Sequence, residues 1–159
     1  MHPTLTPLPA AQWCDGGMDA LYTAIAHASG GGRDGHVRTE DDRLDLDTRA
    51  PQELGGSGEG TNPEQLFAAG YSACFLSALT SVARVHRVRL RDARVRAEVT
   101  IAGGPDGFDL AVELVISAPG VSPDEGQVLL EAAHRKCPYS KAVTGNIPVT
   151  LTLAPEGSS

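Results

Sequence analysis

The sequence predicts one α+β domain in which antiparallel strands pack against two helices. Three observations predict this fold: segments whose polarity alternates as in strands, two helix starts with strong capping residues, and glycine-rich turns between these elements. The 159 residues are enough for one domain with a hydrophobic core. Because apolar residues make up 41% and aromatic residues only 4%, we expect that core to consist mainly of Ala, Val and Leu.

The N-terminal part predicts an arm followed by three short strands. Residues 1–19 contain three prolines and a Gly pair without periodicity, so we expect a loose arm outside a single domain that covers residues 20–155. The segment LYTAIAHAS, which starts at Leu21, alternates as a strand, and the glycines at 30–32 predict a turn. HVRTEDDRLDLDT then indicates two strands with polar faces, which completes an antiparallel meander.

A long helix follows the glycine-rich loop APQELGGSGEGTN. Asn62 is a good N-cap, Pro63 suits the first helical position, and Gln65 stands where a capping-box partner belongs. We expect the helix to extend to about His86. Its residues LFAAGYSACFLSALTSVA are apolar or small on every side, which predicts a helix surrounded by protein.

The second half predicts a hairpin, a helix and a last strand. The strands are ARVRAEVTI and FDLAVELVIS, and the turn between them is GGPDG. Ser122, Pro123 and Glu125 start the second helix by the same capping logic. That helix ends at Cys137, because a residue before a proline, here Pro138, avoids the helical region. The segment NIPVTLTL supplies the final strand.

The charge pattern excludes some classes of partner. A net charge of −7 disfavours binding to a phosphate backbone, and the arginines of HRVRLRDARVRAEV alternate with Val and Leu as on a solvated strand face. No stretch approaches the ~20 apolar residues that span a bilayer, and MHPTLTPLPAAQWC lacks the pattern of a signal peptide. We therefore expect a cytoplasmic protein that binds neither nucleic acid nor membrane.

Three cysteines in a reducing compartment are either buried small residues or reactive thiols. Cys74 lies in the middle of the first helix, and its periodicity alone favours a core residue. Reactivity would require a cation nearby, and one guanidinium at ~4 Å with an effective dielectric constant of ~20 supplies ~4 kcal/mol. Cys137, at a Pro-terminated helix end, is more accessible. Cys14, in the arm, is interpreted as incidental.

Other sites are less well supported by the pattern. A disulfide between Cys74 and Cys137 requires a Cα spacing of ~5.5 Å, which the sequence does not fix. His134 and Cys137 have metal-ligand spacing, but further ligands are not evident, so we expect no metal. GGSGEG lacks the spacing of a dinucleotide-binding loop.

Three segments resemble one known family: YTAIAHASGGGRDG, PQELGGSGEGTNPEQLFAAGYSACFLSAL and EAAHRKCPYSKAVTGNI. They are similar to the organic hydroperoxide resistance (Ohr) branch of the OsmC/Ohr superfamily, from about Leu21 to Leu153. The motifs TNPEQLFAAGYSAC and CPYS are specific to it. The resemblance implies antiparallel sheets wrapped around two central helices in an intertwined homodimer, with sites at the subunit interface.

The resemblance also implies a role for each matched residue. Cys74 would be the peroxidatic cysteine, Cys137 the resolving cysteine, Arg33 the cation that holds the thiolate, and Glu64 the carboxylate that orients Arg33. The N-terminal arm, Cys14 within it, and SKAVTGN after the second cysteine depart from the family pattern. None of these departures removes a matched residue.

The residues add a geometric constraint. Glu64 and Cys74 are ten residues apart, which is ~15 Å of rise on a straight helix, so they cannot touch within one helix. Arg33 would have to bridge the gap, or one group would come from the partner subunit. Because a carboxylate beside the thiol would raise the pKa of Cys74, Glu64 is expected to act on Arg33.

The implied activity is a thiol peroxidase for bulky organic hydroperoxides in oxidative-stress defence. Cys74 would form a sulfenic acid, Cys137 would convert it to a disulfide, and a lipoylated protein or another dithiol would reduce that disulfide without a bound cofactor. Two alternatives are a non-enzymatic thiol redox sensor and a cysteine hydrolase or transferase. The latter would need a histidine base, and none of the five histidines lies in the matched pattern.

Overall fold

The computed structural model describes residues 19–155, which form two compact units. The N-terminal unit extends to Thr48, and the C-terminal unit begins at Arg49. Each unit is described by itself. The expected arm lies outside the described residues apart from Asp19, and so does Cys14.

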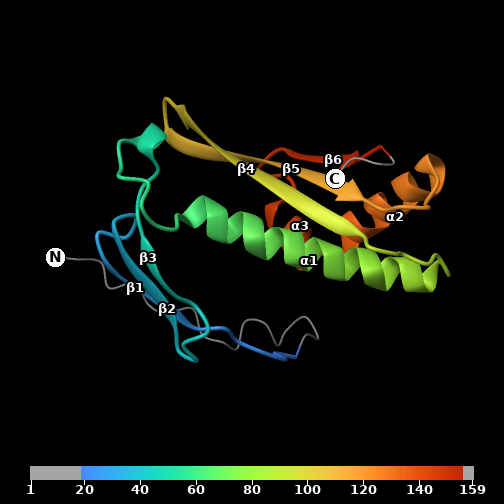
Figure 1. Ribbon diagram of the computed structural model, residues 1–159, viewed down its shortest axis with the longest axis horizontal. Helices are drawn as coiled ribbons and strands as arrows, with labels where there is room; N and C mark the ends of the chain where they lie inside the picture. Colours follow the sequence, from blue (N-terminus) through green and yellow to red (C-terminus); the bar gives the residue numbers. More distant parts are fainter. Residues whose placement is uncertain (1–18, 156–159) are drawn as a thin grey trace. The chain divides into compact units, whose positions relative to one another are not determined.

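The N-terminal unit contains a three-stranded antiparallel sheet in the order β1-β2-β3 (Figure 1). The strands are β1 (Ala26–Gly30), β2 (Gly35–Thr39) and β3 (Asp45–Thr48). The predicted meander is confirmed, but the prediction that the first strand starts at Leu21 is wrong. Ala26 pairs with Thr39, the last residue of β2, so the residues before Ala26 extend beyond the end of β2 and pair with no strand of residues 19–155.

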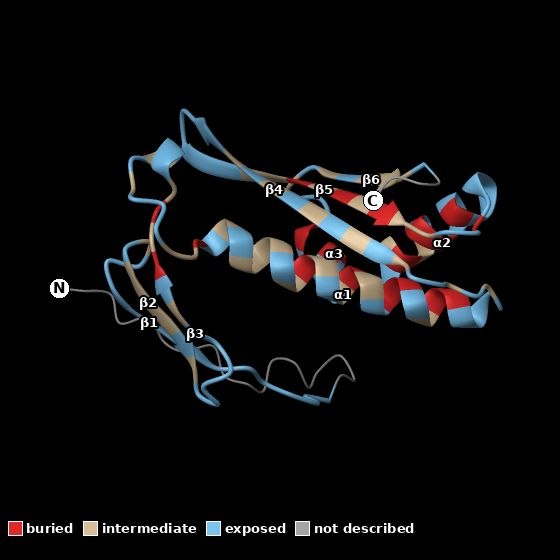
Figure 2. Cartoon of the chain, in the orientation of Figure 1, coloured by how far each residue is buried: buried red, intermediate tan, exposed pale blue. Residues whose placement is uncertain are grey.

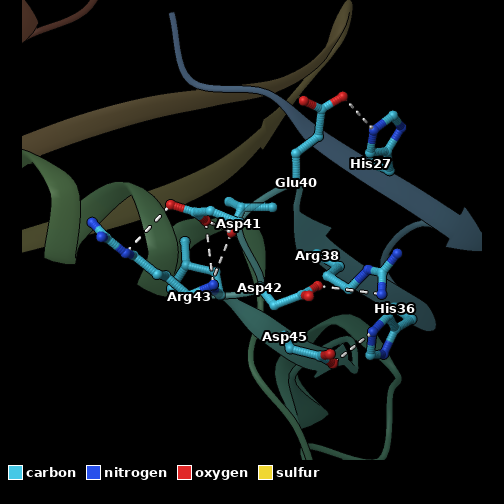
Figure 3. A network of polar contacts seen from close by, with 10 residues as sticks. His27, His36, Arg38, Glu40, Asp41, Asp42, Arg43 and Asp45 are labelled. Carbon is cyan, nitrogen blue, oxygen red and sulfur yellow. Dashed lines mark hydrogen bonds and ion pairs between the residues drawn. The ribbon is translucent and has the colours of Figure 1, made fainter.

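Polar side chains surround His36 on this sheet. Its Nε2 lies 2.9 Å from Oδ1 of Asp45, and its Nδ1 lies 3.0 Å from Oδ1 of Asp47. The hydrogen bond to Asp47 is the main cause that raises the pKa of His36 above its ordinary value of 6.5. Figure 3 shows the contact of His36 with Asp45 beside the ion pair of Arg38 with Asp42, at 3.2 Å. The imidazole therefore links the two strands most firmly when it is protonated.

The sheet of the C-terminal unit consists of β4 (Arg94–Gly104), β5 (Gly107–Ser117) and β6 (Val149–Leu153) in that order. The predicted hairpin is confirmed, and Gly104 pairs with Gly107 across its two-residue loop. The expectation of a wholly antiparallel sheet is wrong, because β6 pairs parallel with β5. The reason is the helical connection between the two strands, which returns the chain to the end of the sheet where β5 began.

The long helix α1 (Pro63–Val85) begins as predicted. The side chain of Asn62 accepts a hydrogen bond from the backbone N–H of Gln65 at 2.9 Å, and the side chain of Gln65 accepts one from the backbone N–H of Asn62 at 3.1 Å. The helix ends at the C-cap His86, also as predicted. A single 3₁₀ turn, η2 (Gln52–Leu54), interrupts the glycine-rich loop before it.

Two further helices lie between β5 and β6. The predicted helix α2 (Pro123–Lys136) has Ser122 as its N-cap and Cys137 at its end. The short helix α3 (Pro138–Val143) was not expected. The proline that stops α2 also suits the first position of a new helix, so Cys137 is both the C-cap of α2 and the N-cap of α3.

The core of the C-terminal unit lies between its sheet and its helices (Figure 1). α1 packs against β4, α2 packs against β6, and the two helices also pack against each other. The expectation of a core built mainly from Ala, Val and Leu is confirmed. Its buried residues include Tyr71, Phe75, Leu79, Val82, Ala83, Val112, Leu114, Ile116, Leu129, Leu130 and Ala133.

α1 differs from expectation in two ways. It is buried on one side only, whereas Ala69, Ala73, Ser77 and Thr80 are exposed along the other (Figure 2). It is also long and apolar enough to cross a membrane by length and composition, with a mean hydropathy of 1.5, so the statement that no stretch approaches this is wrong. Small uncharged residues raise the mean, and the core helix of a soluble protein passes the same test.

Candidate active site

Two cysteines meet where α1 contacts the end of α2. The Sγ of Cys137 donates a hydrogen bond to the Sγ of Cys74 at 3.5 Å. Both are free thiols. Cys137 is fully buried, whereas Cys74 is half-buried. The expectation that the Pro-terminated helix end makes Cys137 more accessible is therefore wrong, because that end packs into the core. The packing of the helices thus brings together two thiols that are 63 residues apart in the chain, and one of them is accessible to a reactant.

Further contacts join the same elements on either side of the sulfurs. The hydroxyls of Tyr71 and Ser140 are 2.9 Å apart in the interior. Lys136 donates to the hydroxyl of Ser81 at 2.7 Å. Because Tyr71 and Ser81 lie on opposite sides of Cys74 along α1, the helix is held near the second cysteine at both positions.

An aromatic cluster borders the thiols. Phe67 stacks on Tyr139 with ring centroids 6.0 Å apart, and Tyr71 lies 5.8 Å from each of these rings. Gly70 makes room for Tyr139, because a Cβ at this position would lie 2.9 Å from the hydroxyl oxygen of that tyrosine. The site therefore has an apolar wall formed by these rings.

The surroundings of Cys74 within the C-terminal unit disfavour its thiolate. Burial is the largest effect and raises the pKa of Cys74, and the thiol of Cys137 raises it further. The backbone N–H of Tyr139 acts in the opposite direction but does not outweigh burial. A reactive thiolate at this position thus requires additional positive charge.

Arg33 lies in the turn between β1 and β2 of the N-terminal unit, where it is half-buried. Gly30 and Gly32 have φ values of +70° and +71°, which glycine adopts readily. The buried hydroxyl of Thr48 donates to the carbonyl of Gly32 at 2.6 Å and accepts from the backbone N–H of Gly35 at 3.0 Å. This single side chain therefore fixes both ends of the segment that carries Arg33.

Glu64 lies in the first turn of α1, whereas Cys74 lies in the middle of the same helix. It borders a hollow of about 560 Å³ whose other walls include Leu54, Ala68 and Val99. α1 is unbroken between Glu64 and Cys74, so the expected axial separation of ~15 Å applies. The structure thus brings together Cys74 and Cys137, and it places Glu64 apart from them on the same helix.

Three residues of this arrangement were not identified from the sequence: Tyr71, Ser140 and Thr48. Tyr71 and Ser140 each lie three residues from a cysteine within the motifs AAGYSAC and CPYS, which was the available signal. Thr48 gave no such signal, because its role depends on the register between β2 and β3, in which it pairs with Gly35.

The metal-spaced pair contains an unusual histidine. Within residues 19–155, Nδ1 of His134 is the one buried side-chain nitrogen or oxygen atom that has no hydrogen-bond partner. Burial, with a smaller effect from Arg135, lowers the pKa of His134. Over the same range no three His, Cys, Asp or Glu side chains form a group that could hold a metal ion.

Comparison with known proteins identifies the family. A family model described as OsmC-like protein matches residues 56–152. An organic hydroperoxide resistance protein of Xanthomonas axonopodis pv. citri is 50% identical over 136 residues, which cover 84% of this chain and 95% of the relative.

Similar solved structures indicate the same family. The crystal structure of an organic hydroperoxide resistance protein from Legionella pneumophila has 48% identity and a TM-score of 0.83, covering 86% of this chain and 100% of that one. A Vibrio cholerae protein described in the same way, with captopril bound in one of the active sites, has 43% identity and a TM-score of 0.80 over 86% of this chain and 94% of that one. The chain therefore belongs to the OsmC-like family, in its organic hydroperoxide resistance branch.

Proposed function

We propose that this chain is a cysteine-based peroxidase that reduces organic hydroperoxides to alcohols in defence against oxidative stress. The observation that carries the proposal is the 3.5 Å contact between the half-buried thiol of Cys74 and the buried thiol of Cys137. Relatives of 42%, 48% and 50% identity are described as organic hydroperoxide resistance proteins, which supports the same substrate class here.

The reaction begins at the more accessible sulfur. The thiolate of Cys74 attacks the distal oxygen of the hydroperoxide, the O–O bond breaks, and the alkoxide leaves as an alcohol after taking a proton. Cys74 is then a sulfenic acid. The thiol of Cys137 attacks this sulfur, an S–S bond forms, and the hydroxyl leaves as water.

The short distance between the sulfurs supports the second step. A disulfide has an S–S length of about 2.05 Å, so the contact of 3.5 Å must shorten by about 1.5 Å. Small rotations of the two side chains supply such a change without unfolding either helix. Sulfenic acid at Cys74 is thereby consumed before a second hydroperoxide oxidises it further.

The first step requires a thiolate, and its immediate surroundings oppose one. We assign the compensating charge to Arg33, with Glu64 as the carboxylate that orients its guanidinium. The support is the raised pKa of Cys74 together with the rigid turn that presents Arg33. In this arrangement Glu64 acts through Arg33 and keeps its own negative charge away from the sulfur.

The substrate and the assembly follow from the apolar surroundings. Phe67 and Tyr139 offer an apolar wall to an alkyl or acyl chain, and hydrogen peroxide gains nothing from it. The exposed small residues of α1, such as Ala69 and Ala73, fit close packing against a second subunit, as in the intertwined homodimer that the family resemblance implies. Light scattering at working concentration tests the dimer. The protein is proposed to act in the cytoplasm.

The decisive experiment is peroxide consumption with reduced lipoamide as the dithiol. Many turnovers with cumene hydroperoxide and a much lower kcat/KM with hydrogen peroxide are expected. The variant Cys74→Ser serves as the control without the attacking sulfur. A lipoylated protein should then replace free lipoamide as the reductant.

The same experiment separates the two alternatives. A redox sensor would be oxidised once per thiol pair and would not turn over with dithiol present. A cysteine hydrolase or transferase would show a burst of acylation at Cys74 with an ester substrate. Either result in place of hydroperoxide turnover would contradict the proposal.

A further inference from the structure

A hydrogen bond accompanies the sulfur contact one helical turn away. The hydroxyl oxygens of Tyr71 and Ser140 are 2.9 Å apart, and both side chains have 0% relative exposure. Tyr71 lies three residues before Cys74 on α1, and Ser140 lies three residues after Cys137 on α3. The two contacts are therefore parallel links between the same two chain segments.

The three-residue spacing on each segment couples the hydroxyl contact to the sulfur contact. Positions three apart on a helix lie on the same face and are separated by about 4.5 Å along its axis. Tyr71 and Cys74 thus point toward the same neighbour, where Cys137 and Ser140 occupy the first turn of α3. A link at one pair holds the other pair at nearly its contact distance.

Burial of both hydroxyls favours the packing of α1 against α3 in which they are hydrogen-bonded. A buried hydroxyl without a partner is unfavourable, so separation of the segments would leave two polar groups unpaired in the core. Tyr71 also packs against Phe67 and Tyr139, which limits the movement of its ring. The hydrogen bond therefore resists the separation of α1 from α3 that would draw the sulfurs apart.

We propose that Tyr71 and Ser140 are positioning residues for disulfide formation between Cys74 and Cys137. Their hydrogen bond confines the dithiol to conformations in which the sulfurs are within reach, so less freedom is lost when the S–S bond forms. Conversely, the disulfide strengthens the hydrogen bond by the same factor, as linkage requires. This deepens the proposed function by assigning residues to its second step.

The test measures disulfide formation without any peroxide. The protein dithiol is equilibrated with glutathione: one oxidised glutathione takes two electrons and two protons from the thiols, which yields the protein disulfide and two reduced glutathione molecules. The effective concentration of the two cysteines is then determined from the fraction oxidised. A Cys14→Ser background leaves only the two relevant thiols.

The variants are Tyr71→Phe, Ser140→Ala and the double variant. Each should lower the effective concentration roughly 3-fold to 10-fold, the factor that corresponds to one neutral hydrogen bond. Ser72→Ala is the matched control, because the hydroxyl of Ser72 donates to the carbonyl of Ala69 in its own helix, at 2.9 Å, and does not link α1 to α3. It should leave the effective concentration unchanged.

The double variant separates positioning from simple stabilisation. It leaves no unpaired hydroxyl, so its thermal midpoint should recover relative to the single variants. Its effective concentration should stay low, because the link between the segments is absent. An unchanged effective concentration in Tyr71→Phe, or recovery in the double variant, would overturn the inference. Failure of the wild-type protein to consume hydroperoxide would instead count against the proposed function, since the glutathione equilibrium needs no peroxide.

Discussion

The hydroxyl of Thr48 lies 2.6 Å from the carbonyl oxygen of Gly32, to which it donates a hydrogen bond across the first turn of the N-terminal sheet. The hydroxyl oxygen of Thr48 in turn accepts a hydrogen bond from the backbone N–H of Gly35 at 3.0 Å. Two backbone groups around Arg33 therefore depend on one buried side chain.

The substitution Thr48→Val should make the turn between β1 and β2 less rigid, while the volume of the side chain at position 48 changes little. We expect the free energy of unfolding of the N-terminal sheet to fall by about 1–3 kcal/mol, because two partners lose their hydrogen bond. If Arg33 stabilises the thiolate, the pKa of Cys74 should also rise. Thr39→Val is the matched control, since the hydroxyl of Thr39 bonds to Asp41 and Leu44 in the next turn of the sheet. An effect of equal size on Cys74 in both variants would contradict the link to Arg33.

Removal of the proposed cation, Arg33→Ala, should raise the pKa of Cys74 further, because burial is then opposed by less positive charge. The rate of reaction with cumene hydroperoxide at pH 7 should fall on the order of 10-fold or more, in proportion to the thiolate. Thiol titration by ultraviolet absorbance in a Cys14→Ser/Cys137→Ser background measures the pKa directly. Arg38→Ala, which breaks the exposed ion pair with Asp42, should not move it. An unchanged titration curve in Arg33→Ala would refute the assignment.

Substitution of each cysteine should block a different step of the reaction. Cys74→Ser should abolish reduction of hydroperoxide, because no other thiol takes its place at the accessible position. Cys137→Ser should still reduce one equivalent and then accumulate sulfinic acid at Cys74, since the sulfenic acid has no neighbouring thiol. Intact-protein mass spectrometry after titration with cumene hydroperoxide reads out both products. If Cys137→Ser turned over hydroperoxide as steadily as the wild-type protein with the same dithiol, the 3.5 Å contact between the two sulfurs would not be used in the catalytic cycle.

The imidazole between two strands should make the N-terminal sheet sensitive to pH. The pKa of His36 is raised above 6.5 in the folded chain, chiefly by the hydrogen bond to Asp47. Its stabilising effect is therefore complete below about pH 6.5 and is lost as the pH rises through the folded-state pKa. His36→Gln should lower the thermal midpoint most at the acidic end of the range from about pH 5 to 8 and least at the alkaline end. His86→Gln, at the exposed end of α1, is the control, and a loss that grows with pH would contradict the sign.

Local capping rules predicted the helices well. Asn62 and Gln65 form the reciprocal bonds that their spacing requires, and Ser122 caps α2. The same rules missed α3, because Pro138 was interpreted only as a stop for α2 although a proline also suits a helix start.

The site was predicted only in part. The motif resemblance identified Cys74 and Cys137, but their contact depends on the packing of two helices that no local pattern describes. The same holds for Tyr71 and Ser140, whose hydroxyls look like ordinary core and surface groups until the tertiary structure pairs them. The strand expected from Leu21 failed for a similar reason, since alternation does not supply a pairing partner.

The parallel pairing of β6 with β5 has a consequence for biosynthesis. Residues 118–148 form one crossover between β5 and β6, and Cys137 lies within this segment. A nascent chain that already contains both cysteines still lacks the strand that anchors the far end of this crossover. We therefore expect the thiol pair to become competent only after translation has passed Leu153, so that premature oxidation of the growing polypeptide is disfavoured until its last strand has docked.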